Sequence, residues 1–161
     1  MKTLPELSLS VETSIGLLTI DELNNEIVSI RWTDEKYYQS SSLLKKTTNQ
    51  IIEFLDKQRT SFEIPLNPIG TNNQKKIWDQ LLKISYGSIK SYLSVAIATD
   101  SHPRVIANAC AANPIPIIIP CHRVIAKNGS LCGYSGGKGK KTKLKLLEIE
   151  GNYFRNKTKM F

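Results

Sequence analysis

The chain has 161 residues, 40% hydrophobic and 22% charged, which suffices for one medium or two small domains to fold around a core without stapling disulfides. It has 22 Lys and Arg residues and 14 Asp and Glu residues. The resulting net charge of +8 favours a polyanionic partner such as nucleic acid, although many soluble proteins are basic without binding one. Three cysteines without zinc-ligand spacing exclude a disulfide scaffold and a structural zinc site, and no stretch has the character of a signal peptide or membrane span. We therefore expect a soluble, cytoplasmic protein, or a nuclear one in a eukaryote.

The first part of the chain predicts an antiparallel sheet followed by one helix. Three β-rich runs, LSVET, GLLTI and EIVSIRW, occupy residues 7–32, with a glycine and an Asn-Asn pair between them as turns. Apolar residues then recur at helical spacing in residues 40–57. Residues 63–71, EIPLNPIGT, contain two prolines and a glycine and predict a linker. We expect one domain at residues 1–67 and a second at residues 68–161.

The second part predicts short helices. Apolar residues at helical spacing favour a helix over residues 74–83. A short helix through about Thr99, a polar turn and a helix opened by Pro103 follow, and a proline is well tolerated at the first helical position. This is the outline of a helix-turn-helix, although any corner of two helices gives the same pattern. Arg104 on the second helix either enters a groove or is a solvated arginine on an ordinary packed helix.

The stretch IPIIIPCHRVI, residues 115–125, ends an apolar run with a thiol, an imidazole and a guanidinium. Free thiols are usually inert and buried. If a helical turn starts at Cys121, its positive end and the neighbouring cations favour the thiolate. His122 is the next residue, and adjacent side chains on a helix point apart. The imidazole therefore reaches the thiol only through a bridging water or along a different backbone path.

The sequence NPIPIIIPCHRVI, followed by GYSGG, closely resembles the O6-alkylguanine–DNA alkyltransferases, also called methylated-DNA–protein-cysteine methyltransferases. The resemblance extends to ETSIGLLTI as the first hairpin, GTNNQKKIWDQLLKISYGSIKSY as the interdomain segment and first DNA-domain helices, and LLEIEG as the final helix. It implies an α+β fold, with a small antiparallel-sheet, ribonuclease H-like amino-terminal domain. The carboxy-terminal domain would be mostly helical and would contain a helix-turn-helix and the active-site cysteine.

The resemblance also implies the chemistry, which is DNA repair by direct damage reversal. Cys121 would accept the alkyl group from the guanine oxygen, irreversibly and once per molecule. His122 would deprotonate the thiol through a water, oriented by Glu150, in a nucleophile–base–acid arrangement. Two extra residues before LLEIEG leave Glu148 as a competing candidate for the acid. Tyr92 would hydrogen-bond the ring nitrogen of the base and help guanine to leave.

Further positions match residues that bind the base. By the resemblance, Tyr134 and Ser135 would line the pocket, with Ser135 on the O6 side of guanine. The backbone carbonyls of Cys121 and Val124 would read the exocyclic amine. Asn113 would tie the recognition helix to the active-site strand.

The implied partner is double-stranded DNA containing O6-alkylguanine, bound by a monomer through the minor groove and largely independently of sequence. The base must leave the stack, because its alkyl carbon cannot be approached in line inside the duplex. The DNA-binding positions would be Tyr92, Arg104, Ala107 and Asn108, with Arg104 replacing the flipped nucleotide. The lysine-rich run at 138–145 either contacts phosphates or is a solvated loop and helix face.

Departures from the family pattern leave two alternatives open. Val105, Ile106 and Ala107 follow the arginine where the family commonly has the smaller Ala, Val and Gly, which could change how closely the helix approaches DNA. One alternative is a non-catalytic alkyltransferase-like protein that only recognises the lesion, against which Cys121 argues; the other is a plain helix-turn-helix regulator. The family's occasional zinc ligands have no counterpart, so we expect no metal and no cofactor. Trp32 and Trp78 are expected in the core.

Overall fold

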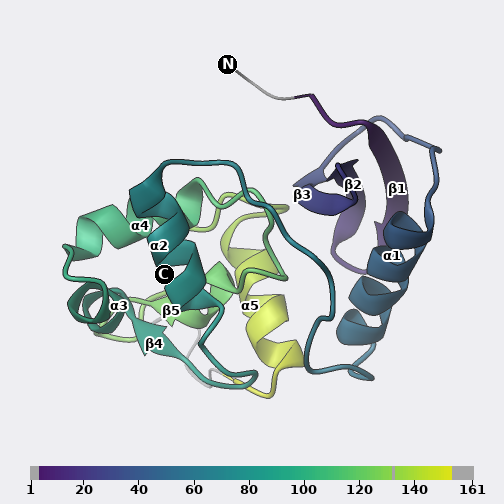
Figure 1. The fold of residues 1–161 in the computed structure, drawn as a ribbon. Helices are drawn as coiled ribbons and strands as arrows, with labels where there is room; N and C mark the ends of the chain where they lie inside the picture. The colour runs from purple at the N-terminus through teal and green to yellow at the C-terminus, as the bar shows by residue number, and fades with distance from the viewer. Residues whose placement is uncertain (1–3, 132, 154–161) are drawn as a thin grey trace.

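The computed structural model describes residues 4–131 and 133–153, in which a small sheet with one helix lies beside a group of helices (Figure 1). The elements are β1 (Leu7–Thr13), β2 (Gly16–Leu23), β3 (Glu26–Trp32), α1 (Ser42–Leu55), α2 (Asn72–Leu81), β4 (Lys90–Ser91), α3 (Tyr92–Ala98), α4 (Pro103–Ala111), the 3₁₀ turn η1 (Cys121–Arg123), β5 (Val124–Ile125) and α5 (Lys140–Ile149). The expected α+β class is confirmed. None of the helices in the described part of the chain is long and apolar enough to cross a membrane.

The amino-terminal half is the expected meander, in which β1, β2 and β3 pair antiparallel in chain order. Asn24 and Asn25 at the second turn have φ of 52° and 61°, the left-handed conformation that tight hairpin turns need and asparagine tolerates. Helix α1 begins where the backbone N–H of Leu44 donates to the hydroxyl of Ser41 at 3.0 Å. Its buried face packs on the sheet, so sheet and helix close one side of the core.

The edge of β3 that does not pair with β2 forms hydrogen bonds with later segments of the chain and so joins the two halves. The backbone of Ile27 donates to Pro65 and accepts from Asn67, both at 2.9 Å, so the predicted linker runs along the sheet. Farther along the strand, the N–H of Ile30 donates to the carbonyl of Pro114 at 2.9 Å, just before the apolar run that leads to Cys121. One hydrophobic cluster contains side chains of both halves. The domain boundary between residues 67 and 68 stays a prediction.

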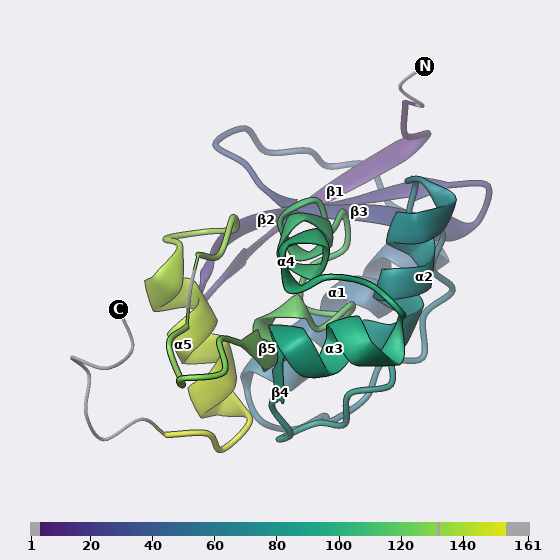
Figure 2. The ribbon, with the colours of Figure 1, turned by 90° about the vertical axis from the view of Figure 1, so that its left-hand side faces the viewer.

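The helical half contains the predicted pair of short helices, α3 and α4, on the face turned to the viewer in Figure 2. Pro103 is the first residue of α4, and the ring nitrogen Nδ1 of His102 caps that helix by accepting from the N–H of Arg104 at 3.1 Å. Helix α2 begins at residue 72, earlier than the expected 74, because Thr71 and Gln74 form a reciprocal capping box.

The two tryptophans differ in burial. Trp78 is 1% exposed, and its indole N–H donates to the carbonyl of Ala109 at 2.9 Å, which ties α2 to α4. Trp32 is only half-buried at the end of β3, so its assignment to the core was wrong in part.

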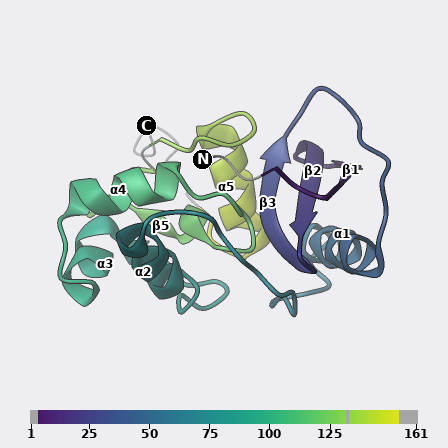
Figure 3. The ribbon, with the colours of Figure 1, turned by 45° about the horizontal axis from the view of Figure 1, so that its top comes forward.

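A short parallel pair, β4 with β5, was not expected. Lys90 lies opposite Val124 and Ser91 opposite Ile125, so the start of α3 is held beside the turn η1. Helix α5 lies between the group of α2, α3 and α4 and the sheet in both Figures 1 and 3. The pairing and the position of α5 bring the start of α3 and the helix α5 close to the turn that contains residue 121.

Candidate active site

Cys121 begins a single 3₁₀ turn rather than an α-helix. The preceding isoleucines are buried, and Ile117 has φ of 75°, a left-handed conformation that is rare for a β-branched residue and bends the run before the turn. The cysteine is 5% exposed. Burial raises the pKa of its thiol, against the lowering effects of a hydrogen bond with Asn113 and the charge of Lys143. The expected preference for thiolate at a helix end is therefore wrong, and the thiol needs a base to ionise.

His122 and Glu150 form a buried pair next to the thiol. The imidazole Nε2 lies 2.7 Å from a carboxylate oxygen of Glu150, and both side chains are 0% exposed. Arg123 donates to the same carboxylate from Nε at 2.8 Å and from Nη2 at 2.9 Å, and to the carbonyl of Ile84 from Nη1 at 2.6 Å. The acid follows the last turn of α5 and also accepts from the N–H of Gly87 at 3.2 Å. Of the two candidate acids, the one at 150 contacts the imidazole.

The hydrogen bonds of this cluster fix the protonation of its members. Burial raises the pKa of Glu150, but the hydrogen bonds with His122 and Arg123 outweigh burial and lower it to about 2. Burial lowers the pKa of His122, although the hydrogen bond with Glu150 opposes that effect. A carboxylate that is ionised can only accept, so Nε2 of the imidazole carries the proton and Nδ1 holds a lone pair. Nδ1 is buried and has no hydrogen-bond partner among the described residues.

A cavity of about 370 Å³ opens beside the thiol, within the size range of small-molecule sites. Four residues expected to bind base or DNA take part in its wall, together with the cysteine. The lining residues are Tyr92, Ala107, Cys110, Ala111, Cys121, Gly133, Tyr134, Ser135 and Lys143. The structure therefore brings together, from α3, α4, the turn η1 and the loop that follows it, five of the eleven residues that the sequence singled out.

Lys143 is the residue of the site that the sequence analysis missed. Its side chain is almost fully buried, and its Nζ donates to the carbonyls of Val124 at 2.7 Å and Leu131 at 2.6 Å and to the hydroxyl of Tyr92 at 3.4 Å. The lysine-rich run at 138–145 is therefore not one solvated face. Helical spacing could have shown this, because Lys143 lies three residues before the buried Leu146 on the apolar side of α5.

Two predicted base-binding residues lie outside this cavity. Val124 is fully buried, and its carbonyl accepts from Lys143. Asn113 follows α4 and lines a neighbouring cavity; its amide donates to the carbonyl of Ile119 at 2.8 Å and accepts from the N–H of Ile115 at 2.9 Å. These bonds fix the apolar run that ends at the cysteine. The suggested contact of the Val124 carbonyl with a bound base stays a prediction, and so does the suggested role of Asn113 in tying the recognition helix to the active-site strand.

The predicted DNA-binding residues of α4 divide between two sides of the helix. Arg104 and Asn108 are exposed on its outer side, and Val105 beside them is 36% exposed. Ala107 faces the cavity. Ala107 therefore lies where the exposed face of the helix meets the cavity.

The fold and the site together define a two-part α+β protein in which a helix-turn-helix lies beside a buried thiol with an imidazole–carboxylate pair. Residues 72–152 match the family model described as the DNA-binding domain of 6-O-methylguanine DNA methyltransferase. The constitutive methylated-DNA–protein-cysteine methyltransferase of Bacillus subtilis (strain 168) is 36% identical, over 92% of this chain and 97% of that protein. The chain belongs to the methylated-DNA–protein-cysteine methyltransferase family.

Solved structures agree with this assignment. The crystal structure of the Mycobacterium tuberculosis O6-methylguanine methyltransferase superposes with a TM-score of 0.80 at 29% identity, covering 94% of this chain and 97% of that one. A structure of the M. tuberculosis protein in complex with DNA gives a TM-score of 0.79 at 31% identity, covering 89% and 92%. The family resemblance, the enzyme class and the fold expected from the sequence are confirmed.

Proposed function

We propose that this protein repairs double-stranded DNA, as a monomer and without a cofactor, by transferring the alkyl group of O6-alkylguanine to Cys121. The observation that carries the proposal is the imidazole of His122, held at Nε2 by an ionised acid while Nδ1 lacks a partner among the described residues. Buried polar atoms are normally hydrogen-bonded, so a purely structural histidine would have both nitrogens satisfied. A ring fixed in this way beside a buried thiol is suited to accept a proton.

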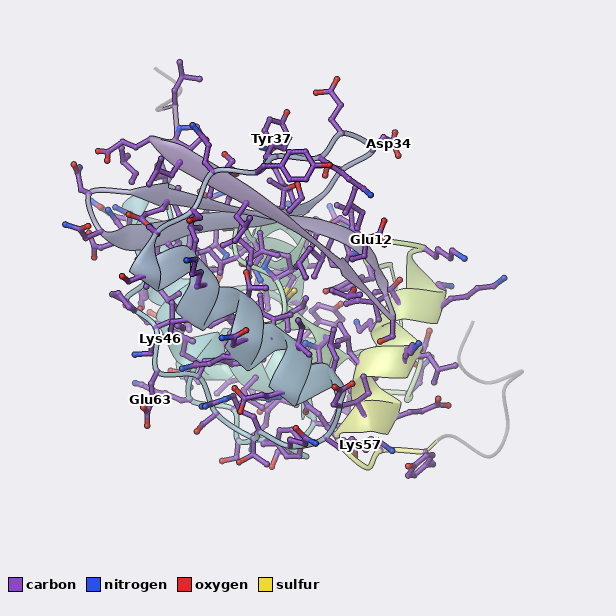
Figure 4. All side chains as sticks on the ribbon, turned by 90° about the vertical axis from the view of Figure 1, so that its right-hand side faces the viewer. Glu12, Asp34, Tyr37, Lys46, Lys57 and Glu63 are labelled. Atoms are coloured by element: carbon purple, nitrogen blue, oxygen red, sulfur yellow. The ribbon has the colours of Figure 1, made fainter. Side chains whose placement is uncertain are left out.

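The distribution of charge supports DNA binding through the helical half. Residues 68–161 contain 15 of the 22 Lys and Arg residues but only four of the 14 Asp and Glu residues. Figure 4 looks onto the opposite side of the molecule, where the labelled charges Glu12, Asp34, Lys46, Lys57 and Glu63 are of both signs and point outwards. Phosphate neutralisation by Lys and Arg supplies most of the affinity for DNA irrespective of sequence. The solved relative in complex with DNA agrees with this choice of partner.

The position of α4 supports extrusion of the damaged base from the minor groove. Arg104 is exposed at the first turn of the helix, where it can enter the stack in place of the departing nucleotide. Ala107 is small and lies between this outer face and the cavity, so the helix leaves room for a base to pass. Asn108 lies on the same exposed face.

The transfer itself needs a proton acceptor, because the buried thiol of Cys121 has a raised pKa. Nδ1 of His122 takes the thiol proton through a water, and the Glu150 carboxylate stabilises the imidazolium that forms. The sulfur then bonds to the alkyl carbon while the carbon–O6 bond breaks, and guanine leaves as an anion that regains its O6 carbonyl. The proton taken from the thiol passes from the imidazolium through solvent to the ring nitrogen, which restores the ring N–H. A thioether is too poor a leaving group for water to displace, so each molecule acts once.

Two residues of the cavity wall assist the departure of guanine. The hydroxyl of Tyr92 lies 3.4 Å from the buried Nζ of Lys143 at the cavity wall, and in our proposal it donates a hydrogen bond to the ring nitrogen of the base. Ser135 supplies a hydroxyl on the O6 side. The ammonium also places a positive charge near the anion that develops during displacement.

The test is intact-mass measurement after the protein is mixed with a duplex oligonucleotide carrying O6-methylguanine. We expect the protein to gain one methyl group at Cys121 and Cys121→Ala to gain none. Binding of the lesion without a change in mass would support the alkyltransferase-like alternative instead. A methyl group on any other side chain would contradict the proposal.

The same assay separates extrusion from transfer. Arg104→Ala should slow repair of the duplex by about tenfold or more while its reaction with free O6-benzylguanine stays near the wild-type rate, because only the duplex requires extrusion. Lys46→Ala, an exposed cation on α1, is the matched control and should leave both rates unchanged. Equal losses on the two substrates would remove Arg104 from its proposed role.

A further inference from the structure

We infer that Trp32, a residue of the amino-terminal sheet, is a positioning residue for the active-site loop Gly133–Gly137. Its indole holds the ring of Tyr134 against the cavity beside Cys121. The inference rests on the proposed function, since it concerns the same cavity, and it assigns to the amino-terminal half a part in alkyl transfer.

One side of the indole is fixed by the sheet. Trp32 ends β3, and its indole N–H donates to the carbonyl of Ile15 at 2.9 Å. A Cβ added at Gly16 would lie 3.2 Å from the ring, so the indole lies directly on the turn between β1 and β2. A hydrogen bond at one end and a close backbone contact along one edge leave the ring little freedom to rotate.

The other side of the indole carries the active-site loop. A Cβ added at Gly136 would overlap the ring, with Cη2 only 2.7 Å away. A Cβ at Gly137 would lie 3.0 Å from the indole nitrogen, and the φ of 51° there is itself a conformation that favours glycine. The two glycines of GYSGG therefore allow the loop backbone to rest on the tryptophan.

The orientation of Tyr134 depends on this contact. Its ring meets the indole edge to face, with 6.3 Å between the ring centres and an angle of 85°. Its hydroxyl is buried and has no hydrogen-bond partner in the described part of the chain. Packing rather than hydrogen bonding therefore holds the ring, and the tryptophan supplies its aromatic contact.

The loop separates two cavities, and this gives the contact a consequence for the reaction. Tyr134 and Ser135 line both the cavity of about 370 Å³ and a second of about 280 Å³, whose wall includes Trp32. Truncation of the indole would enlarge the second cavity and allow Tyr134 to turn into it, out of the wall of the first cavity. Displacements of about 1 Å in the groups that position a substrate can slow a reaction by about a hundredfold.

The first experiment measures single-turnover alkyl transfer from duplex O6-methylguanine by Trp32→Ala. We expect the rate constant at saturating DNA to fall by about ten- to a hundredfold, because the loop loses its support, while the dissociation constant for undamaged duplex stays within about twofold. Trp32→Phe should recover most of the rate. Leu9→Ala, which truncates a half-buried residue elsewhere in the same sheet, is the control for loss of stability alone.

The second experiment tests the contact directly through a double-mutant cycle. Gly136→Ala should slow transfer in the wild-type background, because the methyl group collides with the indole. In the Trp32→Ala background the same substitution should cost little or restore part of the rate, since the space is then open. A tryptophan that merely stabilised the sheet would lower the melting temperature without this dependence on residue 136.

The outcomes distinguish this inference from the proposed function. If the wild-type protein gains no methyl group, the proposed function is wrong. If the wild type reacts but Trp32→Ala reacts as fast as Leu9→Ala, or Gly136→Ala has the same effect in both backgrounds, the positioning role is overturned and the function stands. Should Trp32→Ala not fold, Trp32→Leu keeps an apolar side chain in place and serves in the same cycle.

Discussion

Each half of the molecule holds one buried carboxylate bonded to an arginine, and the two clusters differ in the other groups that contact the acid. In the sheet, Asp21 accepts from Arg31 at 2.8 Å, from the hydroxyl of Ser8 at 2.6 Å and from the hydroxyl of Ser29. The guanidinium also lies over the ring of Tyr37. Every side-chain partner of this aspartate is a donor on β1 or β3, so the hydrogen bonds hold these strands to β2.

In the helical half, Glu150 accepts from Arg123, but its other side-chain partner is the imidazole of His122. This cluster is also less exposed to solvent, since the side chain of Arg123 is 9% exposed whereas that of Arg31 is 42% exposed. A hydroxyl can satisfy a carboxylate but does not titrate near neutral pH, whereas an imidazole held by one nitrogen presents the other as a base. The same ion pair is thus structural in one half and, as we propose, part of the catalytic base in the other.

Among substitutions that test this difference between the two clusters, we expect Glu150→Gln to have the largest effect on alkyl transfer and on stability. The substitution removes the acid that fixes the tautomer of His122 and leaves the buried charge of Arg123 uncompensated. We expect alkyl transfer to slow by about a hundredfold or more, as for other triads that lose their orienting acid. The free energy of unfolding should fall by about 3–5 kcal/mol, as when one partner of a buried ion pair is removed. Intact-mass kinetics and urea unfolding measure the two quantities.

Glu148→Gln is the matched control, because Glu148 is a half-buried glutamate on the same helix two residues earlier. It should leave both the rate and the stability near wild type. The rates are compared at a temperature at which both variants are folded by circular dichroism. If Glu148→Gln were the slower of the two, the orienting acid would have been assigned to the wrong residue.

The fold could be predicted from the sequence wherever a local residue pattern indicates the helix, strand or turn. Alternating residues and turn asparagines predicted the meander, and helical spacing with Pro103 predicted α3 and α4. The pair of β4 with β5 could not be predicted, because strands of two residues carry no periodicity. The bond from Ile30 to Pro114 likewise joins backbone atoms, which no side-chain pattern reports.

The candidate site was predicted where the family motif covers it and missed where distant segments meet. Cys121 and His122 follow from the motif, but the choice between the two glutamates depended on the path of the loop before α5. The helical spacing of Lys143 and Leu146 indicates that this lysine is buried, but the other lysines of the run make it look like part of an exposed face. The contact of Trp32 with Gly136 joins residues about a hundred positions apart, and hydrophobicity alone assigned the tryptophan to the core.

A smaller effect tests the structural side of the comparison, through Asp21→Asn. Burial raises the pKa of Asp21, but the hydrogen bonds from Arg31, Ser29 and Ser8 outweigh burial and hold it below its ordinary value of 3.8. A carboxyl whose pKa is lowered by folding adds stability above its ordinary pKa, and that stability is lost as the pH falls through the lowered value. Asp21→Asn should therefore cost about 1–3 kcal/mol of unfolding free energy at pH 7, and the difference from wild type should shrink below about pH 3.8.

Urea unfolding at a series of pH values measures this difference, and Glu12→Gln is its control. Glu12 pairs with Lys36 at 2.9 Å on the surface, where its side chain is 74% exposed, and such pairs contribute about 0–1 kcal/mol. Alkyl transfer by Asp21→Asn at pH 7 should stay within about twofold of wild type, because the partners of the Asp21 carboxylate are side chains of the sheet, whereas Trp32 contacts the loop at Gly136. A loss of transfer as large as that of Glu150→Gln would mean that the two clusters do not divide into a structural and a catalytic one.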